Sequence, residues 1–288
     1  MPNSLSPTLS IVIVTYNRGH LLPRAVNSVI SQLRTNDQLI VVDDGSTDST
    51  SKYLKNLKKR MPRVTLIFHS HNLGVQHARN SGIKAATGSW TCFLDSDDYY
   101  LPKAIKIIKT NLSKVTKDIG VVQFMLHSTR IRNGSHQLGY LPKRPWHHYR
   151  PSLEDTVLKR HFIGDMHRVI RTSVSQKHLW SLINPGHETY HYAQLASQGV
   201  HFLYINQSVV MVDESDSNSH SYTRFSKYPD QHIKLFQRFL EQFTNIFTLH
   251  HYQKSIYQFY IGQCYLYKRQ YLHSFLWYFR GLISRINS

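Results

Sequence analysis

The chain is poor in cysteine and has no long apolar run. Only two of its 288 residues are cysteine, Cys92 and Cys264, and they lie far apart. Two distant cysteines do not form the disulfide framework of a small secreted domain, so a reducing compartment is expected. The first ten residues lack a basic segment followed by an apolar core, and no apolar run is long enough to span a bilayer. We therefore expect a cytoplasmic protein, either soluble or held peripherally at the inner face of the plasma membrane.

Acidic residues are also scarce. The sequence has 17 Asp and Glu against 35 Lys and Arg, which gives a formal net charge of +18. This balance favours anionic partners, among them nucleic acid, anionic lipid and phosphorylated substrates. The basic residues are spread along the chain, and no Arg-rich arm, zinc-finger spacing or RNA-binding signature is present. We therefore predict no nucleic acid partner.

Two common nucleotide-binding signatures are missing. No Gly-x-Gly-x-x-Gly pattern follows the first predicted strand, and no Gly-Lys-Ser/Thr phosphate loop occurs. These absences argue against a dinucleotide-dependent oxidoreductase and against a P-loop enzyme. The chain is nevertheless 41% hydrophobic, enough to bury the core of one large domain or of a domain with an appendage.

Strand and helix patterns alternate over the first hundred residues. Apolar, β-branched runs predict strands at residues 9–16, 38–42, 64–68 and 90–94. Helical patterns with short connections lie between them, which predicts an α/β fold with a parallel sheet and right-handed crossovers. In open parallel sheets, ligands bind beyond the carboxyl ends of the strands. Polar residues follow each of the four strands, so we expect one binding edge.

The fourth predicted strand ends in three carboxylates, Asp95, Asp97 and Asp98. These side chains would repel one another unless a positive group lay between them. Mn²⁺ or Mg²⁺ takes oxygen ligands from one or two carboxylates and from substrate phosphates, so this stretch is a candidate metal and diphosphate site. The alternative is an acidic surface turn before a helix that starts near residue 102.

The polar strand ends form four blocks that together resemble the family 2 glycosyltransferases of the GT-A fold. The blocks are residues 10–18, 41–48, 72–75 with 78–82, and 93–98. They occur in the order and spacing of the family and cover about the first third of the chain. The resemblance implies a Rossmann-like, mostly parallel sheet flanked by helices. It also implies a nucleotide-diphosphate-sugar donor, with a UDP-sugar favoured, lying across the first four strand ends.

The matched positions imply roles for individual residues. The donor site would contain Thr15, Tyr16, Asn17, Asp44, Arg79 and Asp95. Asp44 would bond the base, and Asp95 would lie near the ribose and the metal. Asp97 would be the main ligand of Mn²⁺ or Mg²⁺. Arg79 would support the donor pocket, with a position on the helix surface, or behind the residues that contact the ligand, as the alternative.

Residues 186–196 have the pattern of a helix start. The family typically has Glu-Asp just before an amphipathic helix here, with the Asp as catalytic base, whereas this chain has His187 and Glu188. The resemblance therefore implies that Glu188 takes the proton from the acceptor hydroxyl. Helix capping and dipole electrostatics also explain a glutamate at a helix start.

The expected GT-A domain covers residues 1–225. It divides into a nucleotide-sugar-binding half at about 1–115 and an acceptor-binding half at about 116–225. In the second half, Tyr140, Trp146 and Tyr149 are candidate sugar platforms, with local packing as the alternative. Asp216 or His220 would complete the metal shell unless residues 213–220 are only a flexible loop. Residues 226–288 predict a C-terminal helical extension packed on the catalytic domain. The alternative for residues 268–285 is contact with an anionic membrane surface.

The resemblance implies an inverting, metal-dependent glycosyltransferase of the hexosyltransferase type. Its acceptor would be the hydroxyl of a glycan or a lipid-linked molecule, in cell-surface polysaccharide synthesis. One alternative is a sugar-phosphate nucleotidyltransferase, which is disfavoured because no Gly-rich, basic triphosphate loop follows the first strand. The other is a non-enzymatic basic protein that binds membranes or nucleic acid and uses the acidic cluster only structurally.

Overall fold

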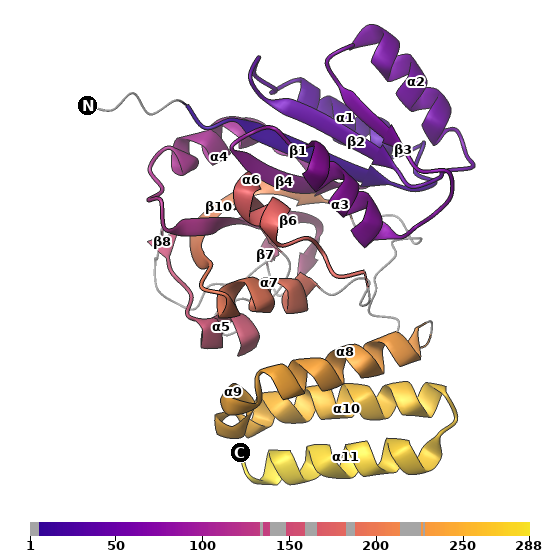
Figure 1. Cartoon of the computed structure of the whole chain (residues 1–288), viewed down its shortest axis with the longest axis vertical. Helices are drawn as coiled ribbons and strands as arrows, with labels where there is room; N and C mark the ends of the chain where they lie inside the picture. Colours follow the sequence, from indigo (N-terminus) through magenta and orange to yellow (C-terminus); the bar gives the residue numbers. More distant parts are fainter. Residues whose placement is uncertain are drawn as a thin grey trace.

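The structure is a computed structural model that describes residues 6–132, 135–138, 148–158, 166–182, 188–213, 226 and 228–288. Figure 1 shows an α/β body in the upper part of the view and a layer of long helices below it. A single sheet runs through the body, with helices on both of its faces.

The first half of the body alternates strands with helices. Its elements are β1 (Leu9–Thr15), α1 (Leu22–Ile30), β2 (Gln38–Asp43), α2 (Thr50–Arg60), β3 (Thr65–Phe68), α3 (Val75–Ala85) and β4 (Trp90–Asp95). The strands lie in the order β3-β2-β1-β4, and every pairing among them is parallel. Strands buried on both faces read as continuous β-branched runs, which is why the sequence predicts them well.

The second half continues the same sheet. Its elements are β5 (Tyr99–Tyr100), α4 (Ala104–Leu112), β6 (Ile119–Arg132), β7 (Ser135–Leu138), β8 (His148–Tyr149), α5 (Leu153–Leu158), β9 (His167–Arg171), α6 (Thr172–Lys177), α7 (Glu188–Ser197) and β10 (His201–Val212). Strand β9 lies between β4 and β6 and is antiparallel to both, while β10 runs parallel to β6. The α/β fold is thus confirmed, with a parallel first half and a mixed second half.

The two faces of β1 belong to two different cores. Ile11 and Ile13 pack with α1, α2 and α4, while Val12 packs with α3 on the other face. Helix α3 approaches β1 closely because it has Gly82 at the contact, where an added Cβ would lie 2.3 Å from a methyl group of Val12. This close approach fixes α3, and with it Arg79, over the edge of the sheet.

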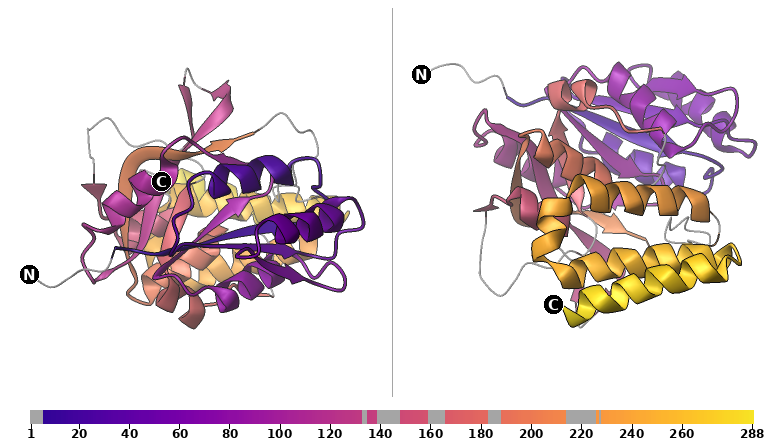
Figure 2. Two further views of the ribbon diagram at one scale, coloured as in Figure 1. Left: turned by 90° about the horizontal axis from the view of Figure 1, so that it is seen from above. Right: turned by 60° about the horizontal axis from the view of Figure 1, so that its bottom comes forward.

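The described residues after the sheet form the helices α8 (Pro229–Gln242), α9 (Thr244–Leu249), α10 (His251–Tyr267) and α11 (Tyr271–Ile286). Phe239, Phe243 and Phe247 join a buried cluster with α5 and α7, so α8 and α9 pack on the body. Helix α10 packs on α8, and α11 packs on α10 as the outermost element (Figures 1 and 2). The large apolar side chains along one side of α11 are exposed, which shows that they do not pack on the body. No helix in the described part of the chain is both long and apolar enough to cross a membrane.

Candidate active site

The carboxyl ends of β1, β2 and β4 meet at one edge of the sheet. Thr15 is paired in register with Asp43, and Val14 with Asp95. The polar residues that follow these strands therefore lie side by side, because parallel strands end at the same edge. This edge contains the strand-end groups that the sequence predicted would converge.

The loop after β1 is clamped to the loop after β2. Asn17 has a left-handed backbone conformation, with φ 52°. Its backbone N–H donates to the Ser46 hydroxyl at 2.8 Å, and its side-chain oxygen accepts from the backbone N–H of Thr47 at 2.8 Å. Asn17 thus shapes the loop that would face a donor. Tyr16 on the same loop is partly exposed, with 38% of its surface accessible.

Thr15 places an unpaired hydroxyl at this edge. The residue is buried, and its Oγ1 has no hydrogen-bond partner among the described residues. A buried hydroxyl without a partner costs free energy. A hydrogen bond between Thr15 Oγ1 and a bound ligand would offset that cost. Thr15 therefore has the chemistry expected of a donor-binding residue.

Asp44 holds the loop before α3. Its carboxylate accepts backbone hydrogen bonds from Leu73 at 3.1 Å and Gly74 at 2.8 Å, and it lies 2.6 Å from Nδ1 of His69. The sequence did not single out His69, whose other ring nitrogen lies 2.9 Å from the Ser81 hydroxyl. Asp44 thus holds the loop before α3 in place beside the edge. Its hydrogen bond to a nucleotide base stays a prediction.

The acidic stretch after β4 is joined to the end of β10 by Arg24 of α1. One guanidinium nitrogen donates to the backbone oxygen of Asp97 at 2.6 Å, and the other pairs with the Asp213 carboxylate at 2.5 Å. Asp98 accepts a hydrogen bond from the backbone N–H of Asp213 at 3.3 Å. Neither Arg24 nor Asp213 was predicted, because each is distant in sequence from the acidic stretch.

The three aspartates of this stretch are in different environments. Burial raises the pKa of Asp98 well above its ordinary value, and the carboxylates of Asp95 and Asp97 raise it further. The Asp95 side chain is 62% exposed at the edge. Among the described residues, no group of three or more His, Cys, Asp or Glu is arranged to hold a metal ion. Asp95 and Asp97 nevertheless fit a Mn²⁺ or Mg²⁺ site, because such ions need only one or two carboxylates when water and a diphosphate supply the remaining oxygens.

Glu188 begins α7 and lies between two arginines. Its Oε1 is 2.8 Å from Nη2 of Arg79, and its Oε2 is 2.9 Å from Nη1 of Arg168. The same Nη2 of Arg79 lies 3.7 Å from Oδ1 of Asp95. Arg79 therefore brings together the candidate base and the candidate metal and ribose ligand, which are 93 positions apart in the sequence (188 minus 95).

An aromatic shelf holds Arg79 in place. Its guanidinium lies over Trp180 at 4.7 Å and over Phe93 at 5.5 Å from the ring centroids. Asn80 fixes the backbone of Trp180 through two hydrogen bonds of 2.8 and 2.9 Å. Arg79 is only 7% exposed, so it does not lie on the helix surface, and its support of a donor pocket stays a prediction. Trp180 and Arg168 were missed because tertiary packing alone brings them to this place.

The arginines set the charge of Glu188. Burial acts to raise the pKa of Glu188, but Arg79 and Arg168 outweigh it, and the pKa lies below its ordinary value. His191 on the same helix stacks on Trp180 at 4.1 Å, and burial lowers its pKa to about 4. At neutral pH the site therefore presents an ionised Glu188 beside a neutral His191.

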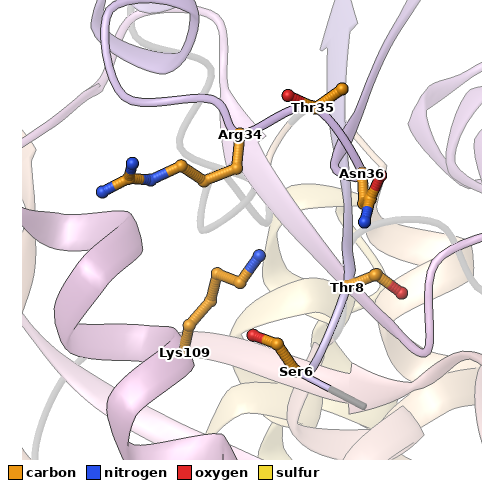
Figure 3. A pocket seen from close by; sticks show the side chains of 6 residues that line it. All are labelled: Ser6, Thr8, Arg34, Thr35, Asn36 and Lys109. Carbon is orange, nitrogen blue, oxygen red and sulfur yellow. The ribbon is translucent and has the colours of Figure 1, made fainter.

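A separate hollow lies at the amino ends of β1 and β2 (Figure 3). It is lined by Ser6, Thr8, Arg34, Thr35, Asn36 and Lys109. The Lys109 ammonium lies 2.8 Å from Asp37, which neutralises its charge. The hollow is at the opposite edge of the sheet from Asp95 and Glu188.

Some residues that the sequence predicted for the site lie outside the described residues. These are Asp216, His220, Tyr140 and Trp146, together with the side chain of Tyr149.

Comparisons with known proteins agree with this architecture. A family model described as glycosyl transferase family 2 matches residues 10–179. An uncharacterized glycosyltransferase of Nostoc is 38% identical over 101 residues, which are 35% of this chain and 31% of that protein. The Escherichia coli uncharacterized glycosyltransferase YibD is 36% identical over 102 residues, 35% of this chain and 29% of that protein. The matched region thus spans about a third of the length of these curated relatives.

Solved structures show the same fold over most of the chain. The crystal structure of S. aureus TarS 1-349 in complex with UDP-GlcNAc aligns with a TM-score of 0.63 at 15% identity, covering 89% of this chain and 81% of that one. A second crystal structure of S. aureus TarS 1-349 aligns with a TM-score of 0.60 at 15% identity and covers 89% of this chain and 80% of that one. At this identity the likeness establishes the fold.

Proposed function

Because the chain belongs to glycosyl transferase family 2, we propose that it moves a sugar from a nucleotide-diphosphate sugar to a hydroxyl of an acceptor, with inversion at the anomeric carbon. One observation carries this proposal: Arg79 contacts both Asp95 and Glu188 at the edge where β1, β2 and β4 end. The residues proposed for the donor and for the acceptor proton thus adjoin each other. A UDP-sugar is the favoured donor, since TarS has been crystallised with UDP-GlcNAc.

The donor would lie across the loops after β1 and β2. The Thr15 hydroxyl lacks a partner among the described residues and would bond the nucleotide, while Tyr16 and Asn17 form the adjoining loop. Asp44 would bond the base while its remaining contacts keep the loop before α3 in place. Asp95 would lie at the ribose, where Arg79 holds it in position.

Asp97, with help from Asp95, would hold Mn²⁺ or Mg²⁺. When bound, such an ion supplies positive charge that stabilises the departing nucleoside diphosphate. Both residues supply carboxylate oxygens, the ligand type that these ions prefer.

Glu188 would accept the proton of the attacking hydroxyl. Its lowered pKa keeps it ionised at neutral pH, and two lone-pair sites remain on the carboxylate beyond those used by Arg79 and Arg168. A carboxylate with a low pKa is a weak base, so its contribution depends on position more than on basicity. Arg79 and Arg168 supply that position by fixing both oxygens. Attack from the face opposite the leaving group inverts the anomeric carbon.

The acceptor would be a glycan or a lipid-linked molecule in cell-surface polysaccharide synthesis, reached from the cytoplasmic side of the membrane. Support for this part of the proposal comes from the net charge of +18, which favours anionic surfaces and substrates. No specific observation favours a nucleotidyltransferase or a non-enzymatic protein, and family membership argues against both.

A thermal-shift screen tests the donor proposal. The full chain would be heated with UDP-, GDP- and dTDP-sugars, with and without manganese, and UDP-sugars with manganese should raise Tm most. At a hundred times Kd, ligand binding stabilises the folded state by about 2.7 kcal/mol. Thr15→Val keeps the shape of the side chain but removes the hydroxyl, and Asp97→Asn removes the proposed metal ligand. Each variant should reduce the shift, and no shift across the whole panel would contradict the proposal.

A further inference from the structure

The outermost helix, α11, has its large apolar side chains on the outside. Eight of them are between 44% and 82% exposed: Tyr271, Leu272, Phe275, Leu276, Phe279, Leu282, Ile283 and Ile286. Their spacing places them on one face of the helix, which we call the α11 apolar face. In Figures 1 and 2, α11 lies on the far side of α10 from the α/β body, so the body does not cover this face.

The face turned toward α10 combines the aromatic residues Trp277 and Tyr278 with small residues at the closest contacts. The Ser274 hydroxyl donates to the backbone oxygen of Gly262 at 2.9 Å, and Ser284 is buried. Gly281 packs against the ring of Phe259, where an added Cβ would lie 2.4 Å from a ring carbon. These close contacts place the small residues of α11 against α10, and its large apolar side chains lie on the other side.

This arrangement is the reverse of that in an ordinary surface helix. A helix in water turns its apolar stripe toward the core and its polar side outward. Helices in an apolar environment pack through small residues and turn large apolar side chains outward. The α10–α11 pair follows the second rule, which indicates that an apolar medium or partner covers the α11 apolar face.

The charged residues around this face indicate which kind of surface it contacts. Residues 242–288 contain no Asp or Glu and five basic residues: Lys254, Lys268, Arg269, Arg280 and Arg285. Of these, Lys268 is paired with Asp230 of α8. Arg280 lies 4.8 Å from the centroid of Trp277, and Arg285 lies 4.6 Å from that of Tyr252. Basic and aromatic residues beside an apolar stripe are typical of helices that lie in the plane of an anionic membrane surface.

We propose that the α11 apolar face docks into the surface of a bilayer that contains anionic phospholipid, with α11 lying parallel to the membrane. Its 16 residues extend over about 24 Å, and the helix is too short and too polar to span a membrane. A second copy of this chain is the weaker candidate, because two such faces would bring basic residues together without acidic partners. This docking goes beyond the proposed transfer reaction and does not require it.

Vesicle sedimentation tests the proposal with the full chain and no nucleotide. The chain should sediment with vesicles of phosphatidylcholine and phosphatidylglycerol, and much less with phosphatidylcholine alone. The double variant Leu272→Ser with Phe275→Ser should weaken binding by about tenfold or more, because two exposed apolar side chains no longer enter the bilayer. Leu182→Ser is the matched control, since Leu182 is 50% exposed but lies far from α11 in the sequence. It should bind like the unchanged chain.

A second pair of variants tests the charge. Arg269→Gln and Arg280→Gln should each weaken binding to the anionic vesicles by about fivefold, the value of one basic residue near such a surface. Arg60→Gln, at the exposed end of α2, should leave binding unchanged. Because these variants leave the apolar face intact, they keep the test valid even if the serine variant folds poorly.

Several results would overturn the proposal. These are no binding of the full chain to anionic vesicles, binding that the serine variant leaves unchanged, or equal binding to both lipid mixtures. A chain that is dimeric in solution, becomes monomeric in the serine variant and does not bind vesicles would assign the face to a second copy. None of these results bears on sugar transfer, which is measured without vesicles.

Discussion

At the scale of single residues, Arg79 and Glu188 decide how the site is arranged. Arg79 is buried against Trp180 and contacts two carboxylates that different elements supply, Asp95 at the end of β4 and Glu188 on α7. An arginine can hold two carboxylates because its planar guanidinium has five donors. Arg168 occupies the second oxygen of Glu188 and lies over Tyr192 at 4.1 Å. Glu188 is therefore fixed on both sides.

Replacing Glu188 separates its chemical role from a structural one. Glu188→Gln keeps the shape but cannot take up the acceptor proton, so kcat should fall by about 10²- to 10⁴-fold. Donor-dependent stabilisation against heat should stay unchanged. Arg168→Gln is the comparison variant, because it removes one partner of Glu188 and leaves the carboxylate in place, and it should reduce kcat less. An active Glu188→Gln enzyme would exclude Glu188 as the base.

His167 makes stability depend on pH. It is buried on β9, its Nε2 lies 3.1 Å from the Tyr100 hydroxyl, and burial together with Arg168 lowers its pKa from 6.5 to about 3. The unfolded chain takes up a proton below about pH 6.5 while the folded chain stays neutral, so acid favours unfolding. Stability should therefore be lost as the pH falls from about 6.5 toward 3.

The measurement is urea unfolding of the full chain and of His167→Gln at pH 7 and pH 5. The unchanged chain should lose about 2 kcal/mol more than the variant over this interval, since one pKa unit corresponds to about 1.4 kcal/mol. His191 contributes equally to both proteins and cancels in the comparison. Parallel losses in the two proteins would show that His167 does not carry this dependence.

At the scale of elements, contacts between helices and strands place the site. Helix α1 carries Arg24, which ties the turn after β4 to the end of β10. Helix α3 carries Arg79 and approaches β1 through Gly82. Strand β9 inserts between β4 and β6 and brings Arg168 to the edge. Each of these elements thus has a packing role and a role at the site.

The contact between α3 and β1 can be tested by adding one methyl group. Gly82→Ala would place a Cβ against the stiff, buried side chain of Val12, so it should destabilise the protein by about 1 to 3 kcal/mol in urea unfolding. The double variant Gly82→Ala with Val12→Ala relieves the clash and should cost less than the sum of the two single changes. Additive costs would mean that the two side chains do not meet.

At the scale of the whole molecule, the inner C-terminal helices pack on the α/β body and the outermost helix faces away from it. Helices α8 and α9 join the body through a cluster of aromatic residues, whereas α11 turns its apolar face away from it. The edge proposed to bind the donor and the α11 apolar face belong to different parts of the molecule, so the proposed membrane docking would not use that edge. This arrangement would suit an acceptor that is itself held by lipid.

Because α8 and α9 pack on the body, we expect the replacement of Phe239 to lower the stability of the protein strongly. This side chain is 2% exposed and packs with residues of α5, α7 and α9. Phe239→Ala should cost about 3 to 5 kcal/mol of unfolding free energy, because it leaves a cavity between the helical layer and the body. Leu272→Ala on the outer face is the control and should change stability little. Equal losses would mean that α11 is covered within the folded chain.

The sequence by itself determined the parallel half of the sheet and which residues lie at its carboxyl edge. Buried parallel strands need unbroken β-branched runs, and the polar residues that follow such runs must lie at the carboxyl edge. The position of Asp44, Asp95 and Asp97 on that edge therefore followed from local pattern.

Only the tertiary structure decided which distant side chains complete the edge and which way the last helix faces. Arg24, Arg168, Trp180 and Asp213 reach the edge through packing of elements far apart in the chain, which no local pattern encodes. The periodicity of α11 indicates an apolar face but not what covers it. Gly262 and Gly281 decide which face of α11 is turned toward α10, because helices pack closest where side chains are smallest. The large apolar side chains of α11 are therefore left outside.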